Sequence, residues 1–112
     1  MASFETRDEH DDPALRPLRV AVRREDLFRE ARELVADLAA WKLVRADEAL
    51  LVLHCERAGG PLGGKARITV TVSGPDDLPS AELRVTSQTS GLLTRDKANV
   101  REFVEHLRRR VG

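Results

Sequence analysis

The residues at 59–66 (GGPLGGKA) come close to a phosphate-binding loop, whose pattern is G-x-x-x-x-G-K-[ST]. Gly59, Gly64 and Lys65 are in register with it, but Ala66 stands where the loop needs a hydroxyl group for Mg²⁺. Such a loop also requires a following helix, because the helix N-terminus supplies the amides that bind phosphate. The residues that follow alternate between apolar and polar types, as in a strand. We therefore predict a hairpin loop here and no nucleotide site.

His54 and Cys55 place a thiol beside an imidazole. Neighbours on a strand point to opposite faces, so the two cannot act as nucleophile and base. Cys55 has the parity of Leu53 and is predicted to be buried, because free cysteine is among the most buried residue types. The three histidines are scattered and the single cysteine has no partner, so we expect no metal, no cofactor and no internal disulfide.

Three pairs of adjacent carboxylates, at 11–12, 47–48 and 76–77, are the remaining candidates for acid–base chemistry. General acid–base catalysis needs a carboxylate whose pKa is moved by its surroundings, whereas acids in tails and turns are normally solvated. The hydroxyl-rich stretch at 86–90 has no recognisable base. We therefore predict no catalytic residue and a protein that is not an enzyme.

A polar face of the predicted sheet is the better candidate for function. Alternation in 66–73 and 81–88 places the polar side chains of both strands on one face. Such a face suits an anionic or polar ligand, a partner protein or a second copy of the chain. It lacks the aromatic platforms on which single-stranded nucleic acid stacks. The candidate surface consists of Arg67, Thr69, Thr71, Arg84, Thr86 and Gln88.

The charge is unevenly distributed, although 19 basic and 19 acidic residues give a net charge of zero. Residues 1–15 carry five acids and one base, whereas residues 95–112 carry six bases and three acids. Zero net charge argues against a global attraction to nucleic acid or to an anionic membrane. A basic patch at Arg108, Arg109 and Arg110 either contacts phosphate or favours the negative end of a helix dipole. Whether the acidic segment docks on the basic helix stays open.

Hydrophobic periodicity predicts the elements that must position these residues. Residues 1–17 are acidic and aperiodic, which indicates a flexible acidic tail before a single domain at 18–112. Asn99 and Glu102 are spaced as a capping box near the start of the last helix. The predicted strands are 18–23, 41–45, 49–57, 66–73 and 81–88, and the predicted helices are 25–40 and 96–110.

Short connections between the later strands favour an antiparallel meander. Both amphipathic helices need an apolar surface, and the apolar face of the sheet provides it. The predicted fold class is α+β, a two-layer sandwich of an antiparallel four- to five-stranded sheet with two helices on one face, in the order β-α-β-β-β-β-α. No apolar run is long enough for a membrane span and no secretory signal begins the chain, so we expect a soluble, cytoplasmic protein.

Residues 20–107 resemble small uncharacterised bacterial α+β domains. These domains have a helix that ends near a Trp, a hairpin with an Asp, a strand that ends in Val-x-Ser and a closing helix. The matching pieces are 40–44 (AWKLV), Asp47, 85–87 (VTS), Asn99, Phe103 and Leu107. The chain departs from the pattern at 95–98 (RDKA), which lacks a glycine. The resemblance implies the same order of elements and no assigned activity or catalytic residue.

These observations favour a non-enzymatic binding or interaction module that uses the polar sheet face or a cleft between helices and sheet. Its partner would be a protein or a small ligand, and a homodimer is compatible with the sequence. One alternative is a small-molecule-binding or hydrolytic domain whose pocket is assembled from distant residues. Another is a weak nucleic-acid binder that uses the basic C-terminal helix.

Overall fold

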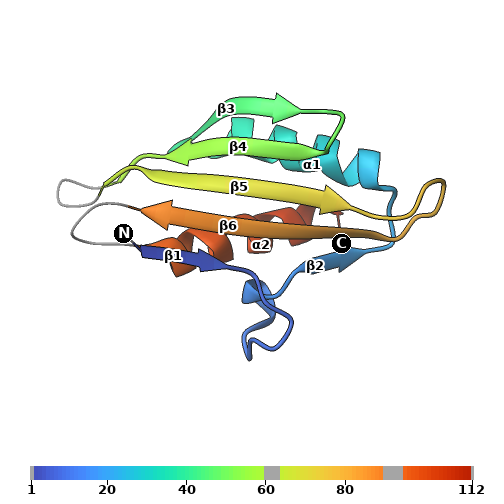
Figure 1. Ribbon diagram of the computed structural model, residues 1–112, viewed down its shortest axis with the longest axis horizontal. Coiled ribbons are helices and arrows are strands. Elements are labelled where there is room, and N and C mark those ends of the chain that lie inside the picture. The colour runs from blue at the N-terminus through green and yellow to red at the C-terminus, as the bar shows by residue number, and fades with distance from the viewer. Residues whose placement is uncertain (1, 60–63, 90–94, 112) are drawn as a thin grey trace.

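The computed structural model describes residues 2–59, 64–89 and 95–111. Six strands form one antiparallel sheet in the order β1-β6-β5-β4-β3, and β2 pairs with β6 along the same edge as β1. Figure 1 looks onto the sheet, with both helices behind it. The elements are β1 (Ala2–Glu5), the 3-10 turn η1 (Pro13–Leu15), β2 (Leu18–Val20), α1 (Arg24–Asp37), β3 (Trp41–Asp47), β4 (Val52–Arg57), β5 (Ala66–Ser73), β6 (Ala81–Thr89) and α2 (Asp96–Val111).

Both helices cover the same face of the sheet, which confirms the predicted α+β fold with two layers. Helix α1 lies against the β3–β5 side and α2 lies against β6 and β1 (Figure 1). Alternation along β5 sends Ile68, Val70 and Val72 toward the helices, where each is at most 2% exposed. The opposite side of β5 is polar, so the sheet has one buried and one solvated face.

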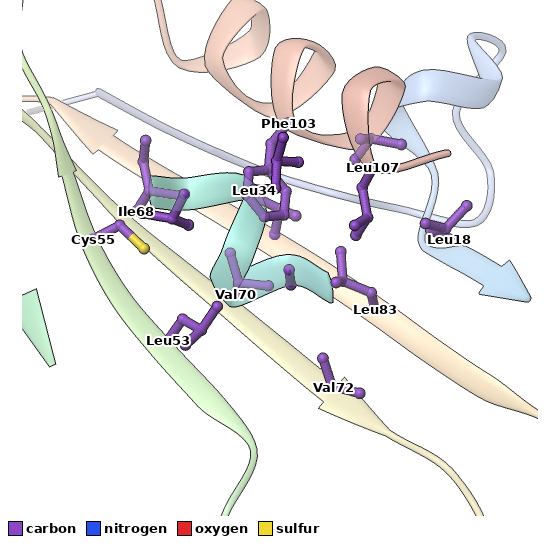
Figure 2. Close-up of a cluster of buried hydrophobic side chains, with 14 of the residues drawn as sticks. Leu18, Leu34, Leu53, Cys55, Ile68, Val70, Val72, Leu83, Phe103 and Leu107 are labelled. Atoms are coloured by element: carbon purple, nitrogen blue, oxygen red, sulfur yellow. The ribbon is translucent and has the colours of Figure 1, made fainter. Parts of the chain in front are cut away.

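The centre of the core is apolar and closely packed (Figure 2). Phe103 and Leu107 of α2 and Leu34 of α1 meet the inner side chains of the sheet, including Leu53 and Leu83. Burying one such side chain stabilises the fold by about 1.5–3 kcal/mol. This apolar centre is what holds the helices on the sheet.

Cys55 is part of this core, as predicted. It is 3% exposed, and burial raises the pKa of its thiol from 9.0 to about 12. The thiolate is the nucleophilic form of cysteine, so Cys55 is inert at neutral pH. His54 lies on the outer face, as its opposite parity predicts, and its Nε2 is 3.3 Å from the Arg45 guanidinium.

The prediction of a flexible tail at 1–17 is wrong for the described residues of that segment. Strand β1 pairs with β6, and the Thr6 amide continues the pairing by donating to the Val85 carbonyl at 3.0 Å. Leu15 is fully buried, and its carbonyl accepts from the Arg7 amide. The exposed edge of β6 offers unpaired backbone groups, and β1 satisfies them without needing an apolar repeat of its own. The sheet therefore gains a strand that periodicity did not predict.

Helix α2 starts at the predicted residue, but the predicted capping box is absent. The helix begins at Asp96, and Asn99 and Glu102 form no capping box. The Asn99 amide donates to Ser87 Oγ, and Glu102 accepts from the Trp41 indole and the Arg57 guanidinium. Tertiary partners therefore take both side chains away from the helix end.

The glycine-rich segment is followed by a strand, as predicted. Strand β5 begins at Ala66, so no helix N-terminus is present there to bind phosphate. Lys65 lies 3.8 Å from Glu56, and residues 60–63 fall outside the described residues. Among the described residues, no helix is long and apolar enough to cross a membrane.

Candidate functional site

The six residues of the predicted polar surface do lie together on the outer face of the sheet. Residue pairing between β5 and β6 is direct, so opposite residues point to the same side. The three cross-strand pairs are Arg67 with Gln88, Thr69 with Thr86, and Thr71 with Arg84. All six side chains are exposed or half-buried. The sequence therefore located this surface, and its function remains a prediction.

The charge on that surface is partly neutralised. Arg84 Nε lies 2.6 Å from Glu82 and its Nη2 lies 3.7 Å from Asp8. A pocket of about 400 Å³ opens at the β1 end of the surface. It is lined by Ser3, Phe4, Glu5, Arg7, Thr86 and Gln88. We call it the outer pocket.

The predicted basic patch at Arg108–Arg110 is exposed, and two of its members have partners within the fold. Arg110 turns toward α1, where its guanidinium contacts Glu30, Glu33 and Asp37 at 3.3, 3.4 and 2.7 Å. The hydrogen bond to Asp37 raises the pKa of Arg110. Desolvation lowers this pKa, but by less, so the pKa is raised overall. Arg108 donates to the Pro13 carbonyl at 3.3 Å. Intramolecular partners therefore hold two members of the patch.

The acidic segment does dock on the basic helix. Arg101 Nη2 contacts Asp12 Oδ2 at 2.8 Å. A hydrogen bond from the Ala14 amide, followed by the one from Arg101, lowers the pKa of Asp12. The charge asymmetry along the chain is thus partly cancelled by contacts within the fold.

A buried polar cluster interrupts the inner face of the sheet where β6 meets the start of α2. Ser87 and Thr89 both donate to Asp96 Oδ1, at 2.7 and 2.5 Å. Asn99 donates to Ser87 Oγ at 3.3 Å. These four residues, at most 5% exposed, are the buried carboxylate cluster of the following sections. Among the described residues, Asp96 Oδ2 has no hydrogen-bond partner.

Asp96 is 5% exposed and forms no ion pair with any residue that the structure describes. Removing a carboxylate from water costs several kcal/mol unless partners compensate. Two hydroxyl donors and the N-terminal end of the α2 dipole supply part of this compensation. Oδ2 is therefore a buried acceptor whose desolvation is not compensated by a described residue.

Sequence reasoning missed Asp96, although one signal pointed to it. Ser87 and Thr89 share the inward parity of Leu83 and Val85, so two hydroxyls stand where apolar residues are expected. Their partner lies on another element, and strand periodicity cannot identify a residue on a helix. The described residues contain no group of three or more His, Cys, Asp or Glu side chains that is arranged to hold a metal.

A second pocket, of about 480 Å³, lies between β1 and the first turns of α2. We call it the β1–α2 pocket, and Figure 1 shows the start of α2 behind the ends of β1 and β6. It is lined by Ser3, Phe4, Arg95, Asp96, Lys97, Ala98 and Arg101.

Two cations lie near the Phe4 ring, Lys97 from the β1–α2 pocket and Arg7 from the outer pocket. Lys97 Nζ is 5.6 Å from the centroid of the Phe4 ring, and the Arg7 guanidinium is 5.7 Å from it. Arg95 and Lys97 are exposed and Arg101 is half-buried. The positive end of the helix dipole adds to these charges. The pocket can therefore hold a small anion with an apolar part against Phe4.

A third polar contact secures α2 farther along its length. Glu102 Oε1 accepts from Trp41 Nε1 at 2.7 Å and from Arg57 Nε at 3.0 Å. Burial raises the pKa of Glu102, but the hydrogen bonds from Arg57 and Trp41 and the Arg57 charge outweigh it, so the pKa is lowered. Glu102 thus links α2 to Arg57, the last residue of β4, and to Trp41, the first residue of β3.

Comparisons with solved structures identify proteins of similar fold. The di-domain ARO/CYC protein BexL superposes with a TM-score of 0.58 at 13% identity, covering 95% of this chain and 41% of that one. The Zhui aromatase/cyclase from a Streptomyces species gives 0.54 at 12% identity, covering 97% and 85%. The protein TTHA0849 from Thermus thermophilus gives 0.55 at 9% identity, covering 97% and 88%. The chain thus spans less than half of the di-domain protein.

No family model matches the chain, and no curated protein matches it. At these low identities the structural likeness shows the fold alone. It confirms a small α+β domain, but it gives no support to the resemblance to uncharacterised bacterial domains. Two of these structural neighbours carry enzyme names, so the fold is compatible with catalysis and the predicted lack of enzyme activity is not supported.

Proposed function

We propose that the protein binds a small organic anion in the β1–α2 pocket. The observation that carries this proposal is the pairing of cationic side chains with the Phe4 ring beside a buried carboxylate that lacks one partner. The volume of about 480 Å³ lies within the range of small-molecule sites, which is roughly 300–1,000 Å³. The proposal agrees with the alternative hypothesis from the sequence, a small-molecule-binding domain whose pocket is assembled from distant residues.

The cations of the pocket differ in their availability. Arg101 is already paired with Asp12, whereas Lys97 contacts the face of Phe4 and forms no ion pair with a described residue. A ligand carboxylate placed near Lys97 gains its charge without breaking an internal salt bridge. Two proteins of similar fold are named as aromatase/cyclase proteins, which supports a small-molecule role for this fold.

Titration with benzoate, followed by amide chemical shifts of the ¹⁵N-labelled chain, tests the proposal. Benzoate offers a carboxylate for Lys97 and a ring for Phe4. We expect saturable shifts at Lys97 and Ala98, and binding at least fivefold weaker for Lys97→Gln. Arg109→Gln is the matched control, because Arg109 is exposed on the same helix outside the pocket. Equal binding by Lys97→Gln and wild type, or no saturable shift, would refute the proposal.

The outer pocket is the second candidate, because it lies at the end of the polar surface that the sequence singled out. Of these two pockets, Thr86 and Gln88 line the outer one, whereas Lys97 and Ala98 line the β1–α2 pocket. The same titration therefore separates the two. Shifts centred on Thr86 and Gln88, insensitive to Lys97→Gln, would assign binding to the outer sheet face instead.

A further inference from the structure

Strand β3 forms one free edge of the sheet, at the opposite side from β1 and its two pockets (Figure 1). We propose that β3 pairs antiparallel with β3 of a second copy of this chain. The two sheets then become continuous in a weak, twofold-symmetric homodimer. This interaction surface is separate from the anion-binding pocket and does not depend on it.

Strand β3 is the longer continuous edge of the sheet. It contains seven residues, Trp41–Asp47. The opposite edge is divided between β1 and β2, which have four and three residues and are separated by the segment that contains η1. An edge strand presents unpaired backbone N–H and C=O groups, so a long unbroken edge is the better template for another strand.

The hydrogen bonds to β4 determine which backbone groups of β3 point to its free side. The Ala58 amide donates to the Ala40 carbonyl at 3.0 Å. In an antiparallel ladder every second residue bonds to a given neighbour, and the residues between them point the other way. Leu43 lies three residues after Ala40 and before the register shift, so its N–H and C=O point away from β4.

A bulge changes this alternation in the middle of β3. Val44 is the extra residue, and pairing resumes at Arg45 opposite His54. His54 lies four residues before Ala58, so it also turns its backbone groups toward β3. Arg45 therefore bonds to β4, and the next residue, Ala46, points its N–H and C=O to the free side.

A symmetric register pairs the two outward residues with each other. Leu43 of one copy lies opposite Ala46 of the second, and each such pair exchanges both N–H···O=C bonds. Bulges usually protect an edge from pairing. Here both copies carry the bulge between the same two residues, so the spacing matches. Both side chains pack partly against the core, and the apolar layer continues across the interface.

The same register brings opposite charges together on the outer face. Lys42 of one copy lies opposite Asp47 of the second, and both are on the outer face because their partners on β4, Glu56 and Val52, share the parity of His54. Neither Lys42 nor Asp47 forms an ion pair with a residue that the structure describes. A shift by one residue would place inner side chains opposite outer ones. Charge complementarity and parity therefore favour a second copy as the partner.

An exposed apolar side chain lies at the centre of this register. Val44 is 57% exposed, and the second copy would cover it. A pairing of residues 42–47 with their counterparts is too short to bury the roughly 1,200–2,000 Å² of a standard interface. We therefore expect a dimer that forms only at high protein concentration.

The test measures self-association of the full chain by sedimentation equilibrium and amide chemical shifts, from micromolar to millimolar protein. We expect the mass to rise with concentration and the shifts to centre on residues 43–46. Lys42→Glu should weaken association at least fivefold, because it places two carboxylates opposite each other. Arg109→Glu makes the same change in charge at an exposed site on α2 and should change association less than twofold.

A complementary pair of variants tests the register. Asp47→Lys alone should also weaken association at least fivefold. Mixed with Lys42→Glu, it should associate nearly as well as wild type, because both ends of the mixed dimer again join opposite charges. Asp47 also accepts from the Leu50 amide, so the dispersion of the amide spectrum must show that this variant is folded. If it is not, wild type mixed with Lys42→Glu should associate with an affinity between those of the two separate chains.

A monomer mass at every concentration would overturn the proposal. Association that Lys42→Glu and Arg109→Glu weaken equally would also overturn it, as would a mixture that associates no better than its components, because another surface would then make the contact. Each of these results leaves the proposed anion binding standing, since the β1–α2 pocket lies at the other edge of the sheet.

Discussion

The two parts of α2 contact the same face of the sheet by different chemistry. Beyond its first turn, Phe103, Val104 and Leu107 are fully buried in the apolar core. In its first turn, Asp96 and Asn99 are also buried, at 5% and 4% exposed, but they bond to hydroxyls of β6. The contrast shows that burial alone does not identify a residue as core.

The two regions also differ in what they contribute to stability. Each large apolar side chain contributes about 1.5–3 kcal/mol when buried. A neutral hydrogen bond contributes only about 0.5–1.5 kcal/mol net, and an unmatched buried acceptor subtracts from that sum. The apolar part of α2 therefore contributes more to its attachment to the sheet than the buried carboxylate cluster does.

The largest effect is expected in the apolar region. Phe103→Ala removes a fully buried ring whose centroid lies 5.2 Å from that of Trp41. We expect the free energy of unfolding to fall by about 3–5 kcal/mol, measured by urea denaturation. A loss below about 1 kcal/mol would mean that α2 is not held by its apolar face. The proposed difference between the apolar part of α2 and its first turn would then be wrong.

A smaller effect is expected in the buried carboxylate cluster. Thr89→Val keeps the shape of the side chain but removes one of two hydroxyl donors from Asp96. We expect a loss of about 1–3 kcal/mol in urea denaturation, because the buried carboxylate becomes less satisfied.

Thr71→Val on β5 is the matched control, since Thr71 is exposed on the outer face. We expect this substitution to change stability by less than about 0.5 kcal/mol. Similar losses for the two valine variants would show that the Thr89 hydroxyl has no special role, and the distinction between the two parts of α2 would lose its support.

The smallest effect concerns Glu102, between the two regions. Its pKa in the folded chain is below the ordinary value of 4.5, so the folded state binds fewer protons than the unfolded state as the pH falls through that value. The Glu102 contribution is complete above pH 4.5 and is lost as the pH falls through the lowered pKa.

Glu102→Gln keeps an acceptor for Trp41 and Arg57 but removes the charge. We expect it to lower stability by less than about 1 kcal/mol at pH 7 and to match wild type in strong acid, in urea denaturation at a series of pH values. A difference that persists at the lowest pH would contradict the assignment of this effect to charge.

Much of the fold could be predicted because each strand or helix shows its own hydrophobic periodicity in the sequence. The alternation of 66–73 matches β5 in both bounds, and the helical stripe around Phe103 and Leu107 matches the buried side of α2. The position of Cys55 followed from parity alone. Strand β1 could not be predicted in this way, because its place depends on the free edge of β6 rather than on its own residues.

The candidate site was predicted only in part. The six outer residues from Arg67 to Gln88 do cluster, because two neighbouring strands with clear alternation must share their polar face. The Arg108–Arg110 patch stays a prediction, and the sequence did not show that Arg110 pairs with three carboxylates on α1, which lies far away in sequence. Asp96 was recognised as a helix start, but not as a buried group.

The sequence by itself determined the α+β class, the two-layer arrangement, the apolar inner face and the burial of Cys55. These properties follow from local periodicity, which each strand and helix carries independently. The tertiary structure decided that residues 2–5 join the sheet, that Asp12 docks on Arg101, and that Asp96 meets Ser87 and Thr89. Such contacts join residues that are far apart along the chain or lie on different elements, and no period within one segment can encode them.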